Sequence, residues 1–187
     1  QAEGDIPSLV SSWTRQAREV SLREEIRDIG VGYGLLDEEP LYVLFFGLSA
    51  EEFFAGKSAG LEDRKRLRRE MLERVNQERK KARLPILYEN PLLERAAQRH
   101  AEDMLARSFY GHETPEGRTP SQRARAAGYA PRSIAENIAR GQFSVGEVMD
   151  GWMESEVHRG NILNPFFSEV GFGFAHGKNE SGPAVFW

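Results

Sequence analysis

Two of the four histidines in the sequence lie where an imidazole could take part in chemistry. His112 follows a helical pattern and lies in an irregular stretch rich in glycine, proline and threonine, and functional residues are often carried by such loops. His158 lies in the segment Trp152–Leu163. His100 has the spacing of a packed helix residue, and His176 falls in a polar turn. We therefore take His112 and His158 as the candidate functional imidazoles.

A carboxylate inside an apolar run adds a third candidate. Glu136, followed by Asn137, lies in the strand-like run Ser133–Ala139, and a buried carboxylate is costly without a cationic partner, a metal ion or an open polar cleft. Two neutral imidazoles and one carboxylate suit zinc and leave a fourth position for water. The His-Glu-x-x-His helix of many zinc hydrolases is absent. Together with His112 and His158, Glu136 therefore predicts either a weak metal centre or a hydrogen-bonded polar cleft.

Ser155 offers a different chemistry. It lies three residues before His158, so a nucleophile and a base could meet on one helical face. Ser155 is not set in a Gly-x-Ser-x-Gly elbow, and no third member of a triad is evident beside it. The identity of any catalytic residue stays unknown at this stage.

The elements that must position these residues alternate between helices and short apolar runs. An apolar stripe through a basic segment predicts a helix that ends before Pro85, and two later helices have proline in their first turn. Ser144 is a candidate cap for another helix. The expected helices span about 64–83, 91–107 and 120–127 and begin again after 144, with a buried strand near 134–139 and apolar runs at 170–175 and 184–187.

The N-terminal segment repeats the pattern of the C-terminal one. Helical spacing around Leu9–Ala17 precedes two β-prone runs separated by a turn, which predict a hairpin over 29–34 and 41–46. Its Gly-x-Gly start resembles the run Val170–Phe174, and a tryptophan-bearing helix precedes each. We interpret this as an internal repeat, the alternative being two hairpins alike by chance. Residues 1–56 would then be a degenerate half copy of a domain at 57–187. This half copy contains no histidine, and its hairpin could swap between two chains.

Bulk properties narrow the partners and the compartment. A net charge of −4 gives no positive field for nucleic acid, and the absence of cysteine excludes disulfides and thiolate metal sites. The longest apolar run, Leu41–Leu48, is too short for a transmembrane segment. The sequence starts at Gln1 rather than methionine, which fits an exported protein whose signal peptide has been removed.

Several motifs in a fixed order resemble one known family. A stretch of about 125 residues in this chain is similar to the bacterial, SCP-like branch of the CAP superfamily. The superfamily comprises cysteine-rich secretory proteins, antigen-five allergens and plant pathogenesis-related proteins. The motifs that carry the resemblance are Val75–Arg79, Ala97–Met104, His112 with Pro115-Glu116-Gly117, Arg123–Tyr129, Ala135–Ala139, Trp152–Ser155, His158–Leu163 and Val170–Gly173.

The resemblance implies an α+β fold, specifically a three-layer α-β-α sandwich with a central antiparallel sheet, in a protein found outside the cell or in the periplasm. It also implies an open cleft with two histidines and acidic residues that binds zinc or another divalent metal in some members. His112, Glu136 and His158 fall on three of those positions, and His112 and His158 would be the metal ligands. The eukaryotic branch has a glutamate where this chain has Ser155, with Glu154 beside it.

Three functions follow from these observations. The first is an exported binding module whose cleft takes a small molecule, a lipid or a peptide, with or without a divalent metal. The second is a metal-dependent hydrolase or protease in which Glu136 acts as general base toward a metal-held water. The third is a structural interaction protein. Because no nucleophile and base are evident together, we expect the binding module rather than a conventional enzyme.

Overall fold

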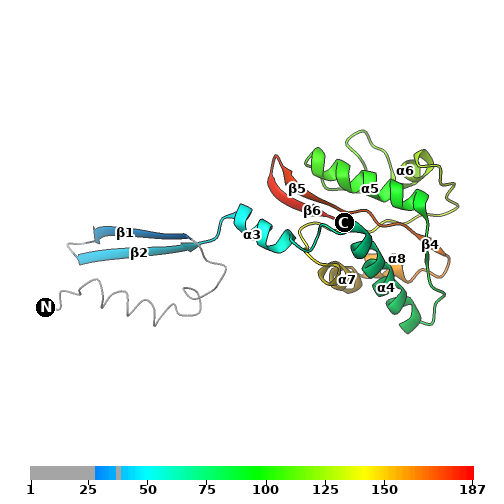
Figure 1. Ribbon diagram of the computed structural model, residues 1–187, viewed down its shortest axis with the longest axis horizontal. Coiled ribbons are helices and arrows are strands. Elements are labelled where there is room, and N and C mark those ends of the chain that lie inside the picture. The colour runs from blue at the N-terminus through cyan, green and yellow to red at the C-terminus, as the bar shows by residue number, and fades with distance from the viewer. Residues whose placement is uncertain (1–27, 37–38) are drawn as a thin grey trace. The chain divides into compact units, whose positions relative to one another are not determined.

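A computed structural model describes residues 28–36 and 39–187, whose helices and strands are drawn in Figure 1. The chain divides into two compact units, residues 1–55 and residues 56–187. The helix expected around Leu9–Ala17 lies outside the described residues. The origin of the first unit as half of a second CAP-like copy stays a prediction.

The first unit contains the expected hairpin. Strand β1 (Asp28–Leu36) pairs antiparallel with β2 (Glu39–Gly47), and Val31 lies opposite Leu44. Helix α3 (Ala50–Ser58) follows, and Ser49 caps its first turn by accepting a hydrogen bond from the Glu52 N–H at 3.2 Å. Residues 56–58, which the sequence suggested as part of a linker, continue this helix.

Four helices of the second unit begin at a residue whose side chain caps the first turn. Asp63 accepts from the Arg66 N–H, Asn90 from the Leu92 N–H and Ser144 from the Glu147 N–H, and each bond satisfies a first-turn donor. Thr119 forms a full capping box. The helices are α4 (Arg64–Lys81), α5 (Pro91–Ala106), α6 (Pro120–Ala126), α7 (Val145–Glu154) and α8 (Glu156–Ile162).

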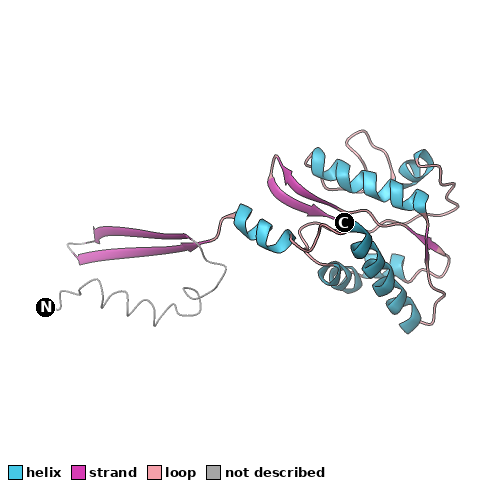
Figure 2. Ribbon diagram, in the orientation of Figure 1, coloured by secondary structure: helices cyan, strands magenta, loops and turns pink. Residues whose placement is uncertain are grey.

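The strands of the second unit are short (Figure 2). Strands β5 (Ala175–Asn179) and β6 (Gly182–Phe186) form an antiparallel hairpin, and a separate parallel pair joins β3 (Tyr88–Glu89) to β4 (Glu169–Val170). Ala139 exchanges two backbone hydrogen bonds with Trp187, at 3.1 and 3.0 Å, so the end of the 134–139 run joins the β6 edge.

Helix and strand content of this kind confirms the α+β class. In Figure 1, α5 and α6 lie on one side of the β5–β6 hairpin, and α4, α7 and α8 lie on the other. The expected strand over 134–139 is reduced to pairing at Ala139–Gly141 and an isolated bridge between Arg140 and Phe186. Earlier in that run, the side chain of Glu136 contacts His112 and Arg123, and the side chain of Asn137 bonds to α8. Both residues belong to the site described below.

Two glycines let a backbone segment lie directly on helix α5. A Cβ at Gly171 would overlap the main chain at Leu93 and Glu94, and a Cβ at Gly173 would overlap the main chain at Ala97. Only glycine permits such an approach, because any other residue would place a carbon where the helix backbone already is. The Gly-x-Gly pattern therefore fixes the distance between α5 and the segment leading into β5.

A buried arginine joins α4 to the loop after α8. Arg79 is 0% exposed and donates to the carbonyl oxygens of Pro85, Ile162, Asn164 and Phe167 at 2.7 to 3.0 Å. Five N–H donors in a planar fork suit such a set of acceptors. Arg79 thus holds the chain that passes from α8 toward β4.

Candidate functional site

His112 is carried by a loop that its own neighbours order. Arg107 at the end of α5 pairs with Asp103 at 2.6 Å and with Glu116, so both ends of the loop are tied to one guanidinium. The hydrogen bonds from Arg107 lower the pKa of Glu116 to about 2. Gly117, at φ 78°, closes a turn through its N–H bond to the Thr114 carbonyl. The loop therefore presents His112 in a defined position, with about half of its side chain exposed.

Glu136 lies between a histidine and an arginine. Its Oε1 is 3.0 Å from His112 Nδ1, and its Oε2 accepts from Arg123 at 2.5 Å. Arg123 also donates to the His112 carbonyl at 2.6 Å, which closes the network. The side chains of Arg123 and Glu136 are only 10% and 19% exposed. Arg123 is thus the cationic partner that a buried carboxylate requires.

Helix α8 brings His158 toward the same region. Burial lowers the pKa of His158, and the charge of His112 lowers it further. Asn137 donates to the His158 carbonyl at 3.0 Å and accepts from Asn161 at 2.9 Å. Asn137 therefore fixes the position of α8 relative to Glu136.

Ser155 and Glu154 lie at the junction of α7 and α8. Ser155 is the N-cap residue of α8 but makes no side-chain capping bond, and Glu154 is exposed. Within the described ranges, no hydrogen bond joins either residue to His112, Glu136 or His158. The geometry joins His112 to Glu136 and ties Asn137 to the backbone of His158, and it leaves the roles of the His158 imidazole and of the junction as predictions.

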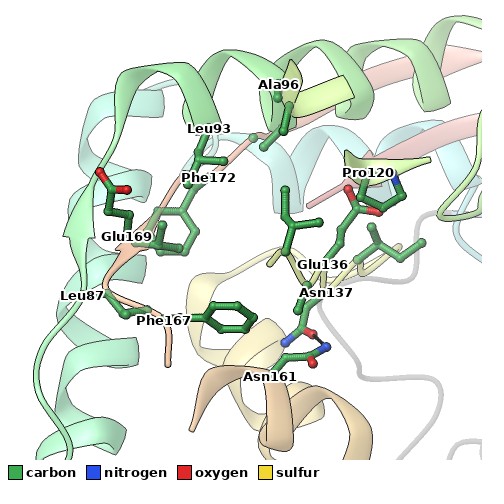
Figure 3. A pocket seen from close by; sticks show the side chains of 18 of the residues that line it. Leu87, Leu93, Ala96, Pro120, Glu136, Asn137, Asn161, Phe167, Glu169 and Phe172 are labelled. Atoms are coloured by element: carbon green, nitrogen blue, oxygen red, sulfur yellow. Dashed lines mark hydrogen bonds between the residues drawn. The ribbon is translucent and has the colours of Figure 1, made fainter. Parts of the chain in front are cut away.

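A large cavity adjoins this network. Its volume is about 790 Å³, and Glu136 and Asn137 lie on its wall. Figure 3 shows Leu93, Ala96 and Phe172 on one side of the pocket, with Phe167 and the bonded amides of Asn137 and Asn161 on the other. Pockets of this size accept drug-sized ligands. Of the cleft residues expected from the sequence, Glu136 and Asn137 thus border a larger, mostly apolar space, whereas His112 and His158 are not part of its lining.

His100 also lines this cavity. The residue is 3% exposed, its Nε2 lies 2.9 Å from the Gly111 carbonyl oxygen, and its ring meets Phe109 edge to face. Its Nδ1 is buried and has no hydrogen-bond partner among the described residues. Helical spacing correctly indicated a packed histidine, but it gave no sign of the cavity beside it.

Sequence reasoning missed Arg123 as well as His100 and the cavity. Arg123 lies in a recognised motif, and the rule that a buried carboxylate needs a cation could have directed attention to it. A cavity leaves no comparable signal, because its lining residues come from five helices and from segments between them that are distant in sequence.

Comparison with known proteins identifies the family. The sequence profile described as CAP: Cysteine-rich secretory protein family matches residues 72–187, more than half of the chain. The chain belongs to the CAP family. The uncharacterized protein YkwD of Bacillus subtilis (strain 168) is 35% identical over 106 residues, which are 57% of this chain and 41% of that protein. The CAP chain thus matches less than half the length of this bacterial relative, and the family resemblance seen in its motifs is confirmed.

Solved structures show the same CAP fold. An extracellular protein containing a SCP domain from Bacillus anthracis str. Ames has a TM-score of 0.55 and 22% identity, over 78% of this chain and 45% of that one. An outer surface protein from Borrelia burgdorferi has a TM-score of 0.54 and 22% identity, over 63% of this chain and 86% of that one. At this identity the likeness concerns the fold alone. Of the described helices, none is long and apolar enough to cross a membrane.

The residues of the CAP cleft fit a three-ligand metal centre poorly. Across the described part of the chain, no group of three His, Cys, Asp or Glu side chains is arranged to hold a metal ion. Both oxygens of Glu136 are engaged, one by His112 and the other by Arg123. What is left is two imidazoles with a carboxylate that orients one of them. Binding of zinc or another divalent metal by His112 and His158 stays a prediction.

The buried histidine predicts a loss of stability in acid. Burial lowers the pKa of His100, and the charge of Arg123 lowers it further, against smaller opposing effects of Glu136, Gly111 and Asp103. The unfolded chain, with a histidine pKa of about 6.5, then binds more protons than the folded chain, so stability rises with pH. The contribution is present above about pH 6.5 and is lost as the pH falls toward the folded pKa.

We therefore expect the free energy of unfolding to fall more between about pH 7.5 and pH 5 in the wild type than in His100→Gln. Urea unfolding at both pH values measures the difference, and the variant removes the contribution of this one group. Equal losses in the two proteins would show that His100 does not titrate with unfolding.

Proposed function

We propose that this CAP domain is a binding module of an exported bacterial protein, and that its cavity takes a small apolar ligand or the apolar chain of a lipid. The observation that carries the proposal is the cavity of about 790 Å³ between α4, α5, α7 and α8. Arg123 and Glu136, which is bonded in turn to His112, form a polar edge to that space. Mostly apolar walls with a few placed polar groups are typical of small-molecule sites.

Export is supported by the relatives. One structural neighbour is described as extracellular and another as an outer surface protein. A chain without cysteine can work in an oxidising compartment with no risk of wrong disulfides. We accordingly place the module outside the cell or in the periplasm.

The internal chemistry favours binding over catalysis. Each oxygen of Glu136 already has a partner, His112 on one and Arg123 on the other, so a water in the position of a general-base substrate would share the carboxylate with both. Hydrolysis by a metal-held water stays a prediction. The α-β-α sandwich and the exchange of the N-terminal hairpin between two chains are two further predictions. Metal content of protein isolated without chelator, compared with His112→Ala, tests the metal expectation.

Diphenylhexatriene, an uncharged apolar probe that fluoresces when removed from water, tests the proposal. We expect it to bind the wild-type protein, and we expect Ala96→Phe, which fills the cavity from α5, to weaken binding at least about tenfold. Ala106→Phe is the matched control, because it places the same side chain on an exposed position of the same helix. Equal binding by both variants would show that the probe does not enter the cavity.

A further inference from the structure

The cavity meets solvent between two irregular segments. A residue that lines the cavity and is also exposed lies where the cavity opens. Arg132 and Ser133, which follow α6, meet both conditions, and so does Phe166, which follows α8 and is 90% exposed. Met71 and Met104 line the same cavity and are only 2% and 1% exposed. An elongated ligand therefore has one end among buried methionines and the other end near Arg132 and Ser133.

Arg132 is the lining arginine whose charge the protein does not balance. Arg68 pairs with Glu94 at 2.6 Å, and Arg123 pairs with Glu136 at 2.5 Å. Across the described residues, the side chain of Arg132 makes no ion pair and no hydrogen bond. A guanidinium keeps its charge at any pH that a protein meets. The opening thus carries one positive charge that is available to a ligand.

The carboxylates of the lining do not compete for this charge. Glu136 is engaged by the partners described above. The two carboxylate oxygens of Glu169 accept hydrogen bonds from Asn90 at 2.7 Å and from Tyr129 at 2.8 Å. Because both side chains are held by other groups, an anionic partner for Arg132 has to come from a ligand.

Further hydrogen-bond donors lie next to Arg132. Within the described ranges, the backbone of residues 130–135 makes no hydrogen bond, and the hydroxyl group of Ser133 has no partner. Donors that are bonded only to water can exchange it for the oxygens of a ligand. A guanidinium fork beside such N–H and O–H groups suits a carboxylate or a phosphate, because an ionised oxygen accepts the strongest hydrogen bonds.

We propose that Arg132 and Ser133 form an anion subsite at the opening, and that the cavity takes an amphiphile with one long apolar chain and a carboxylate or phosphate head. This inference rests on the proposed function, since it names the ligand class of the same cavity. The apolar walls bind the chain, and Arg132 selects the charge of the head. A cationic head would be repelled by Arg132, and a neutral head would gain no ion pair there.

Probes that share a ten-carbon chain test the head group. Isothermal titration of the full chain at pH 8, below the concentrations at which the probes form micelles, measures decanoate, decyl phosphate, 1-decanol and decyltrimethylammonium. We expect both anions to bind the wild type at least about tenfold more tightly than decyltrimethylammonium. In Arg132→Gln both anions should lose at least about tenfold in affinity, whereas 1-decanol should change by less than about twofold. The anion that binds the wild type more tightly identifies the preferred head.

Arg125→Gln is the matched control, because Arg125 is an exposed arginine of α6 outside the cavity lining. It changes the net charge by the same amount as Arg132→Gln, so a general effect of charge would appear in both variants. We expect Arg125→Gln to keep both anion affinities within about twofold of the wild type. Ser133→Ala should weaken both anions by about threefold, through the loss of one donor.

Three results would overturn the anion subsite. They are equal losses of decanoate and 1-decanol binding in Arg132→Gln, equal losses of decanoate binding in Arg132→Gln and Arg125→Gln, and tighter binding of decyltrimethylammonium than of decanoate by the wild type. With any of these, diphenylhexatriene binding that Ala96→Phe weakens would leave the proposed function standing. No binding of any of these probes would overturn both.

Discussion

Gly173→Ala should destabilise the CAP domain by at least about 3 kcal/mol. A Cβ at this position overlaps the carbonyl group of Ala97 in α5, so the helix and the segment before β5 must separate. Main chain cannot move aside as a flexible side chain can, and a shift at this contact disturbs the packing of α5 on β5. For a domain of this size, the expected fall in melting temperature is about 10 °C, measured by circular dichroism.

Gly151→Ala provides the control, because it makes the same substitution at an exposed position of helix α7 with nothing within 4 Å of the added Cβ. Alanine favours a helix over glycine, so this variant should be more stable by up to about 1 kcal/mol. A melting temperature of Gly173→Ala that equals the wild-type value would show that the close approach to α5 is absent in solution.

Arg79→Leu should cost about 3–5 kcal/mol in the free energy of unfolding. The substitution leaves four carbonyl oxygens without their donor, at Pro85, Ile162, Asn164 and Phe167. Buried acceptors that lose a charged donor carry the full desolvation cost. Urea unfolding measures the loss.

Arg69→Leu is the matched control, since it removes an exposed arginine from the same helix. Its effect should lie within about 0.5 kcal/mol, as for most surface substitutions. Similar stabilities for the two leucine variants would show that the Arg79 bonds contribute little. The contrast separates a bonded, buried guanidinium from the charge of the basic helix as a whole.

Local signals predicted the elements of the fold well. Helix starts followed from the cap residue Ser144 and from the first-turn proline Pro91, because such signals depend on residues close in sequence. The strand expected over 134–139 makes backbone pairs only at its end, where Ala139 bonds to Trp187 and Gly141 bonds to Val185. Whether a strand-like run finds a neighbouring strand depends on tertiary structure, which the pattern of apolar residues in the run does not show.

The candidate site was predictable only where chemistry shows in residue types. An isolated carboxylate in an apolar run marked Glu136, and its partner His112 was marked by its loop. Nothing local marked the cavity, whose wall includes the buried His100. A cavity arises from how helices distant in sequence pack, so its polar lining has no pattern in the chain.

The central claim is that an apolar chain lies inside the CAP domain, and nuclear Overhauser effects from bound 1-decanol test it most directly. We predict effects between the methylene groups of decanol and the side chains of Met71, Met104 and Ile138, which line the cavity from different elements. Effects confined to exposed apolar side chains outside the cavity lining, such as Val157 on α8 or Val31 of the hairpin, would contradict the claim.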